Sequence, residues 1–203
     1  MQIHLHNNDL AENVTFRGDV AVDTETLGLR PTRDRLCVVQ LCDGGEDVHL
    51  VQFTGENYDA PNLKTLLADG NRQFIFHFAR FDLAVLQHYL GVSFSDVYCT
   101  RIASYLTRTY TDRHGLKELC GELLNVEISK QQQSSNWAAE TLSDAQMNYA
   151  ALDVYYLHQL RERLEGMLEE TGRTELAQSC FRFLPTRATL DLAGFEAMDI
   201  FAH

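Results

Sequence analysis

Four acidic residues stand at positions where the surrounding pattern predicts apolar side chains. Asp23 and Glu25 are two residues apart in the segment 19–25, whose alternation predicts a strand, so both point to one face of a sheet. Asp82 interrupts the apolar stripe of a helix predicted over residues 79–90. A carboxylate on such a face is either satisfied locally or serves a chemical purpose.

The fourth acid, Asp153, lies on the inner face of a long helix predicted over residues 143–171. Steps of three and four residues connect it with an apolar stripe made of Leu157, Leu160, Leu164 and Leu168. Tyr149 lies one helical turn before Asp153 on the same stripe, so both side chains are expected to face the core.

Each acid has an ordinary explanation when it is considered alone. Asp82 could pair with Arg80, Asp23 could open a turn, and Asp153 could pair with a neighbouring arginine. All four together are harder to explain, because like charges 4 Å apart repel by about 4 kcal/mol at an effective dielectric constant of about 20. A divalent cation would neutralise them. Oxygen ligands without a Cys/His cluster favour Mg²⁺ or Mn²⁺ over Zn²⁺.

The elements that would position these acids alternate between strands and helices. Strands are predicted over residues 19–25, 36–42, 48–53, 73–76 and 97–99, the first three joined by hairpins. Helices are predicted over 62–68, 79–90, 102–107, 116–124 and 143–171, followed by a helix and an irregular tail after Gly172. The pattern is typical of an α/β fold with a mixed five-stranded sheet flanked by helices on both faces.

The composition is that of one ordinary globular domain. The chain has 203 residues, 45% hydrophobic and 23% charged, and its longest apolar runs are too short to span a membrane. Five cysteines without a Cys-x-x-Cys pair predict reduced thiols, and the polar N-terminus shows no secretory stretch, so we expect a cytoplasmic location.

The net charge limits the kind of nucleic-acid partner that the chain could hold. Seventeen Lys and Arg against 29 Asp and Glu give a formal net charge of −12. Such a surface argues against binding of a long nucleic acid through many phosphate contacts, but it does not exclude a short nucleic-acid substrate.

Three separated motifs resemble those of the DEDD 3′–5′ exonucleases. They are Asp23-Thr24-Glu25-Thr26-Leu27-Gly28-Leu29, His77-Phe78-Ala79-Arg80-Phe81-Asp82 and Tyr149-Ala150-Ala151-Leu152-Asp153. The third motif, with Tyr149 four residues before Asp153, resembles that of the tyrosine subgroup of this family. The histidine subgroup would have His at position 148, where this sequence has Asn. Residues 130–137, 142–144 and 149–157 extend the resemblance to ribonuclease D, over about residues 17–170.

The chain also departs from ribonuclease D, because it stops before the helical nucleic-acid-binding domains that follow the catalytic domain there. We therefore expect a single domain over residues 1–203, with a core at about 17–170 and a C-terminal helix and tail at 172–203. A compact acidic relative of this kind most resembles the nanoRNase C family of bacterial nucleases. That resemblance implies a ribonuclease-H-like fold, very short oligonucleotides, notably dinucleotides, as substrates, and a ring-shaped homo-octamer.

The resemblance also implies roles for individual residues. Asp23, Glu25, Asp82 and Asp153 would hold two Mg²⁺ or Mn²⁺ ions, with Asp23 bridging both, and Tyr149 would orient the attacking water. Cleavage would release 5′-mononucleotides from the 3′ end of short single-stranded RNA, with short DNA as a further candidate.

Substrate contacts are predicted around these motifs. Leu29 is placed to wedge between two bases and Phe81 to stack on one, although a hairpin leucine and a core phenylalanine are the ordinary alternatives. A 5′ phosphate could be held by Arg80, Arg101 and the run from Lys130 to Ser134, which is otherwise a solvated loop. The full candidate set is Thr26, Leu27, Leu29, His77, Arg80, Phe81, Arg101, Lys130, Gln133 and Ser134.

Three alternatives remain open at this point. The chain could trim longer 3′ RNA or DNA ends as ribonuclease D does. It could be an inactive exonuclease fold used for binding, although such a protein is expected to lack at least one of the four acids, and all four are present here. It could also proofread DNA together with a partner polymerase.

Overall fold

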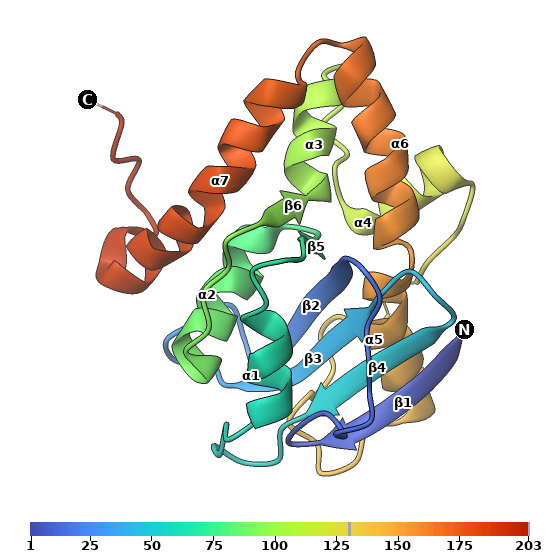
Figure 1. Ribbon diagram of the computed structural model, residues 1–203, viewed down its shortest axis with the longest axis vertical. Helices are drawn as coiled ribbons and strands as arrows, with labels where there is room; N and C mark the ends of the chain where they lie inside the picture. The colour runs from blue at the N-terminus through green and yellow to red at the C-terminus, as the bar shows by residue number, and fades with distance from the viewer. Residues whose placement is uncertain (130, 203) are drawn as a thin grey trace.

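A computed structural model describes residues 1–129 and 131–202 and shows a mixed sheet covered by helices on both faces (Figure 1). The six strands are β1 (Gln2–Asn7), β2 (Val20–Thr26), β3 (Leu36–Cys42), β4 (Asp47–Gln52), β5 (Phe74–Phe76) and β6 (Val97–Cys99). Their spatial order is β1-β4-β3-β2-β5-β6. The predicted α/β class is confirmed.

The central part of the sheet is the predicted hairpin meander. Strands β2, β3 and β4 pair antiparallel, whereas β5 and β6 continue the sheet parallel to β2. All seven residues of β3 are buried, as expected for a strand with neighbours on both edges and helices on both faces.

The predicted strand count was wrong by one. The additional strand, β1, pairs parallel with β4 at the edge of the sheet. Its sequence alternates polar His, Gln and Asn residues with only two aliphatic side chains, and none of its residues is fully buried. An edge strand of this kind is held by backbone pairing, so its hydrophobic pattern is weak.

The helices follow the predicted spans with one larger difference. They are α1 (Pro61–Leu67), α2 (Ala79–Leu90), α3 (Thr100–Thr107), α4 (Leu116–Leu119), α5 (Asp144–Tyr155), α6 (Leu157–Glu170) and α7 (Thr174–Leu190), with π-helical turns η1 (Cys120–Leu124) and η2 (Asp191–Phe195). The single helix predicted over residues 143–171 is divided at Tyr156 into α5 and α6. The stripe of four leucines in α6 is buried as predicted.

The core of the described chain is continuous beneath both helical layers. It contains the apolar residues of the strands together with the inner faces of α2, α5, α6 and α7. All five cysteines are free thiols, four of them buried, in agreement with the expected reduced state. Among residues 1–129 and 131–202, no helix combines the length and the hydropathy that a membrane crossing requires.

Two features of the sheet determine where the acids meet. Because β5 runs parallel to β2, the carboxyl ends of both strands lie at one edge, and the segment after β5 is brought beside the end of β2. Alternate residues of β2 face opposite sides of the sheet, and α5 and α2 cover these two sides (Figure 1).

The start of α5 is secured by a capping box. The Ser143 hydroxyl accepts from the backbone N–H of Gln146, and the Gln146 side chain accepts from the backbone N–H of Ser143. Gln146 also donates to the hydroxyl of Ser135 and the carbonyl of Asn136, so the start of α5 and the preceding loop are fixed together.

We predict that Ser143→Ala lowers the free energy of unfolding by about 1 kcal/mol, because an N-terminal cap of α5 is lost. Urea denaturation followed by circular dichroism measures the change. Ser179→Ala, at an exposed position inside α7, is the matched control and should change the value by less than about 0.5 kcal/mol. Equal effects of the two substitutions would contradict the role of the cap.

Candidate active site

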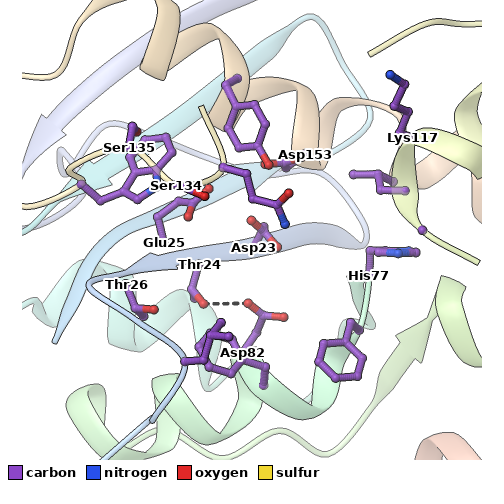
Figure 2. Close-up of a pocket in the computed structure, with 18 of the residues that line it drawn as sticks. Asp23, Thr24, Glu25, Thr26, His77, Asp82, Lys117, Ser134, Ser135 and Asp153 are labelled. Carbon is purple, nitrogen blue, oxygen red and sulfur yellow. Dashed lines mark hydrogen bonds between the residues drawn. The ribbon is translucent and has the colours of Figure 1, made fainter. Parts of the chain in front are cut away.

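A cavity of about 640 Å³ lies at the carboxyl ends of β2 and β5. Its wall is formed by the hairpin loop after β2, the start of α2, one turn of α3, the segment around α4, the loop before α5, and α5 itself. The size is within the range of pockets that enclose one small ligand. Figure 2 shows the side chains that point into it.

Three of the four predicted acids converge on one side of β2. Ligand oxygens of Asp23, Glu25 and Asp153 all lie within 4.8 Å of one another. Asp23 and Glu25 share a face of β2, as predicted from their spacing, and α5 brings Asp153 to that face (Figure 2). The three side chains are half-buried, so their oxygens are accessible from the cavity.

The fourth acid, Asp82, approaches from the other side of β2. It lies in the first turn of α2 and is only 3% exposed. The Thr24 hydroxyl donates to Asp82 Oδ1 at 2.6 Å, and both residues line the cavity (Figure 2). Thr24 lies between Asp23 and Glu25 in the strand, so Asp82 approaches from the opposite side of the strand, yet close enough for the charge of Asp23 to raise its pKa.

Burial and mutual repulsion disfavour the charged state of these acids. Burial raises the pKa of Asp23 to about 7. Burial, together with the charges of its acidic neighbours, raises the pKa of Glu25 to about 10. The pKa values of Asp82 and Asp153 are also raised, first by burial and then by the charge of Asp23.

The chemistry of this donor set fits divalent cations. Among the described residues, none of the four acids forms a salt bridge with Arg, Lys or His. The three clustered carboxylates, without a thiolate or imidazole among them, form a hard-oxygen site of the kind that Mg²⁺ and Mn²⁺ occupy.

Tyr149 lies beside these acids, one turn before Asp153 in α5. Burial and the charges of Asp153, Glu25 and Asp23 raise the pKa of its phenol well above the usual value. The phenol therefore keeps its proton at neutral pH, which suits orientation of a water molecule and not abstraction of a proton.

The histidine at the start of the second motif is held through its ring. Nδ1 of His77 lies 2.9 Å from the Thr100 hydroxyl, which also donates to the carbonyl of Phe76 at 3.2 Å. The side chain of His77 lines the cavity.

Phe78 follows with a left-handed backbone, φ 69°, which is a strained conformation for a residue other than glycine. Its ring is nearly half exposed, and the guanidinium of Arg101 lies 4.9 Å from the ring centroid. This pair presents a cation and an aromatic face at the rim of the cavity.

The opposite rim is the hairpin loop that joins β2 to β3. Leu27 and Leu29 are 52% and 85% exposed there, although both are large apolar side chains. Asp34 holds the loop by accepting from the backbone N–H of Arg30. A Cβ at Gly28 would lie 2.3 Å from Asp34 Oδ2, so a larger residue there would displace this carboxylate from the Arg30 N–H.

Most of the predicted substrate-contacting residues line the cavity. They are Thr26, Leu27, Leu29, His77, Phe81, Arg101, Gln133 and Ser134. Lys130, which belongs to the same prediction, lies outside the described residues.

The placement predicted for Arg80 was wrong. Its guanidinium forms a bidentate pair with Asp191 at 2.6 and 2.8 Å and also donates to the carbonyl of Glu196, outside the residues that line the cavity. Arg80 therefore attaches the C-terminal segment to α2. Sequence spacing could not show this pairing, because the two residues are 111 positions apart.

The cavity also contains residues that the sequence analysis did not select. The most notable are Lys117 at the start of α4, Trp137 and Ser135 in the loop before α5, and Phe78. Trp137 is buried, and its ring centroid lies 6.0 Å from that of Tyr149. Lys117 had one available signal, a cation two residues after Gly115 at the start of a predicted helix.

With this geometry established, comparison with known proteins identifies the class. The sequence profile of a 3′–5′ exonuclease family matches residues 5–169. Ribonuclease D of Gluconacetobacter diazotrophicus is 32% identical over 170 residues, and DNA polymerase I of Aquifex aeolicus is 37% identical over 149. The chain belongs to the 3′–5′ exonuclease family. It spans 43% and 24% of the length of these two curated relatives.

A solved structure gives a similarity over the whole chain. NrnC of Brucella melitensis is 58% identical, with a TM-score of 0.95, and the match covers 100% of both chains. The same nuclease has been solved bound to pGG, with a TM-score of 0.96, and with bound Mg²⁺, with a TM-score of 0.94. Escherichia coli RNase D is more distant, at 26% identity and a TM-score of 0.72 over 84% of this chain. The predicted ribonuclease-H-like fold and the resemblance to nanoRNase C are thereby confirmed.

We predict that the metal-free protein loses stability as the pH rises from 7 to 8.5. The pKa of Glu25 is about 4.5 without its folded environment and about 10 within it, so the folded state holds a proton that the unfolded state releases. The free energy of unfolding should therefore fall by about 1–2 kcal/mol over this interval. Addition of Mn²⁺ should restore it.

Denaturation with urea at each pH, with chelator and with Mn²⁺, measures this effect. Glu25→Gln should flatten the metal-free profile, whereas Glu140→Gln, at an exposed position, should leave it unchanged. A metal-free profile that rises with pH in the wild-type protein would contradict the repulsion among the acids.

Proposed function

We propose that the protein is a metal-dependent 3′–5′ exoribonuclease that hydrolyses very short oligonucleotides, notably 5′-phosphorylated dinucleotides, to 5′-mononucleotides. The observation that carries this proposal is the convergence of Asp23, Glu25 and Asp153 within 4.8 Å at the wall of a confined cavity. Its cofactors would be two Mg²⁺ or Mn²⁺ ions. The structure of NrnC with bound Mg²⁺ supports Mg²⁺ as the metal.

The acids would divide between the two ions according to their positions. Asp23 would contact both, Glu25 and Asp153 would complete the shell of the first, and Asp82 would hold the second directly or through water. When bound, the cations would stabilise the attacking and leaving oxygens of an in-line displacement. Tyr149 stays protonated at neutral pH, so its hydroxyl would orient the attacking water by donating a hydrogen bond to it.

The substrate contacts follow from the two rims of the cavity. Leu29 would insert between the two bases from the hairpin loop, and the exposed ring of Phe78 and the partly buried ring of Phe81 would offer stacking surfaces. Arg101 and Lys117 would hold phosphate, with Gln133 and Ser134 as neutral donors. His77 and Thr26 would contact the sugar and phosphate nearer the acids.

Two observations support the preference for a short substrate. The cavity, about 640 Å³, matches one small ligand, and NrnC, similar over its full length, has been solved bound to pGG. A ring-shaped octamer and a cytoplasmic location also belong to this proposal, on the resemblance to nanoRNase C.

Trimming of longer 3′ RNA ends is the second candidate. It is supported by the ribonuclease D relatives, although the match spans only 43% and 42% of the length of two of them. An inactive exonuclease fold is expected to lack at least one of the four acids, whereas all four are present in this chain and line the cavity.

We predict that a 5′-labelled, 5′-phosphorylated dinucleotide is cleaved at least about tenfold faster than a labelled ten-mer, a difference of about 1.4 kcal/mol. A product time course on two to ten nucleotides, with Mg²⁺ and with chelator, tests this. Equal or faster cleavage of the ten-mer would favour the trimming function.

The matched variants for this assay are Asp23→Ala, which should abolish turnover, and Tyr149→Phe, which should reduce the rate by about 10- to 100-fold because water orientation is lost. Both should remain folded by circular dichroism. Near wild-type cleavage by Asp23→Ala would refute the site.

We further predict a shallow dependence of dinucleotide affinity on salt, with a log–log slope of about −1 to −2, because only a few phosphate contacts form. Titration in Ca²⁺ at 50–300 mM salt measures the slope. Lys117→Met should bring it closer to zero by about one, whereas a slope of about −5 would indicate a long binding track.

A further inference from the structure

One polar side chain stands in the most buried strand of the sheet, directly behind the clustered acids. Gln40 is the only polar residue of β3 and is 0% exposed. The antiparallel register places it opposite Asp23 of β2. Its Nε2 donates to Asp23 Oδ2 at 3.3 Å.

The orientation of this amide follows from its neighbour. An ionised carboxylate only accepts hydrogen bonds, so the amide nitrogen must face Asp23. The amide oxygen, Oε1, is buried and has no hydrogen-bond partner among the described residues. A buried amide that is half satisfied destabilises the fold, and an aliphatic side chain would suit this strand better.

A buried glutamine on the neighbouring strand shows the ordinary arrangement. Gln52 of β4 is 2% exposed, and its Nε2 donates to the carbonyl of Ala139 at 2.8 Å. That amide fastens a loop to the sheet. Within residues 1–129 and 131–202, the Gln40 amide has no backbone partner of this kind, and its one hydrogen bond goes to Asp23 in the cavity.

We propose that Gln40 is a positioning residue that holds the Asp23 carboxylate in the orientation required by the divalent cations. This inference rests on the proposed function, because it concerns the same cations. A neutral donor restrains rotation of the carboxylate while leaving its full charge to the metal, whereas Arg or Lys at this position would compete with the metal for that charge.

The second acid-holding contact has the same character. The Thr24 hydroxyl, also a neutral donor, holds Asp82 at 2.6 Å on the other side of β2. Two of the four acids assigned to the ions, Asp23 and Asp82, are thus restrained by neighbours that carry no charge. Gln40 is the less expected of these neighbours, since its amide costs stability at a position outside the cavity lining.

The test is the affinity of the protein for Mn²⁺ without substrate, measured by electron paramagnetic resonance or calorimetry. Gln40→Met keeps the length of the side chain and removes the donor. We expect its dissociation constant for Mn²⁺ to rise about three- to tenfold, the effect of ordering one side chain upon binding. The Mn²⁺ concentration for half-maximal cleavage should rise by the same factor, and saturating Mn²⁺ should recover most of the rate.

Two comparisons separate positioning from loose packing. Gln52→Met removes an equally buried amide from the same sheet and should leave the Mn²⁺ affinity unchanged. Tyr149→Phe should lower the rate without changing Mn²⁺ affinity, and excess Mn²⁺ should not rescue it. If Gln40→Met does not fold, Gln40→Asn supplies an amide too short to reach Asp23 and should show the same rise.

Two results would overturn the assignment of Gln40. One is wild-type Mn²⁺ affinity in the folded Gln40 variant, and the other is an equal loss of affinity in Gln52→Met. These results are distinguishable from failure of the proposed function, in which the wild-type protein itself would neither bind Mn²⁺ nor cleave a dinucleotide.

Discussion

Repulsion among carboxylates in a poorly hydrated crevice is the constraint on which the rest of this structure depends. Asp23, Glu25 and Asp153 lie too close together to be charged at the same time without a counter-ion, and the described residues supply none. A fold that evolved only for stability would replace at least two of these acids. The raised pKa values of the acids and their affinity for cations therefore have the same cause, the close approach of buried carboxylates.

The sheet and its helices hold this arrangement against the repulsion. Parallel pairing of β5 with β2 brings the second motif to the end of the first, and α5 lies against four strands of the sheet. The capping box at Ser143 and the contacts of Gln146 fix both α5 and the loop that closes the cavity. Helices and strands thus carry the acids, while the exposed apolar side chains of Leu27 and Leu29 lie on the hairpin loop.

Much of this could be predicted from the sequence because it follows from periodicity. The alternation of β2 predicted that Asp23 and Glu25 share one face of the strand. The leucine stripe predicted that Asp153 and Tyr149 lie on the inner face of their helix. Contacts between distant segments carry no periodic signal. The pairing of Arg80 with Asp191, the hydrogen bond of Thr24 to Asp82 and the edge strand β1 were therefore accessible only from the coordinates.

The charge distribution connects the site with the size of its substrate. The chain carries a formal net charge of −12, yet Arg101 and Lys117 both line the cavity that contains the acids. Two local cations match the few phosphates of a dinucleotide, whereas each further phosphate of a longer chain would lie over a surface of its own sign. Cations bound by the acids would offset the negative charge inside the cavity, while the rest of the surface would stay acidic. Under the proposed function, the excess of acid that attracts the metal would therefore also repel longer polymers.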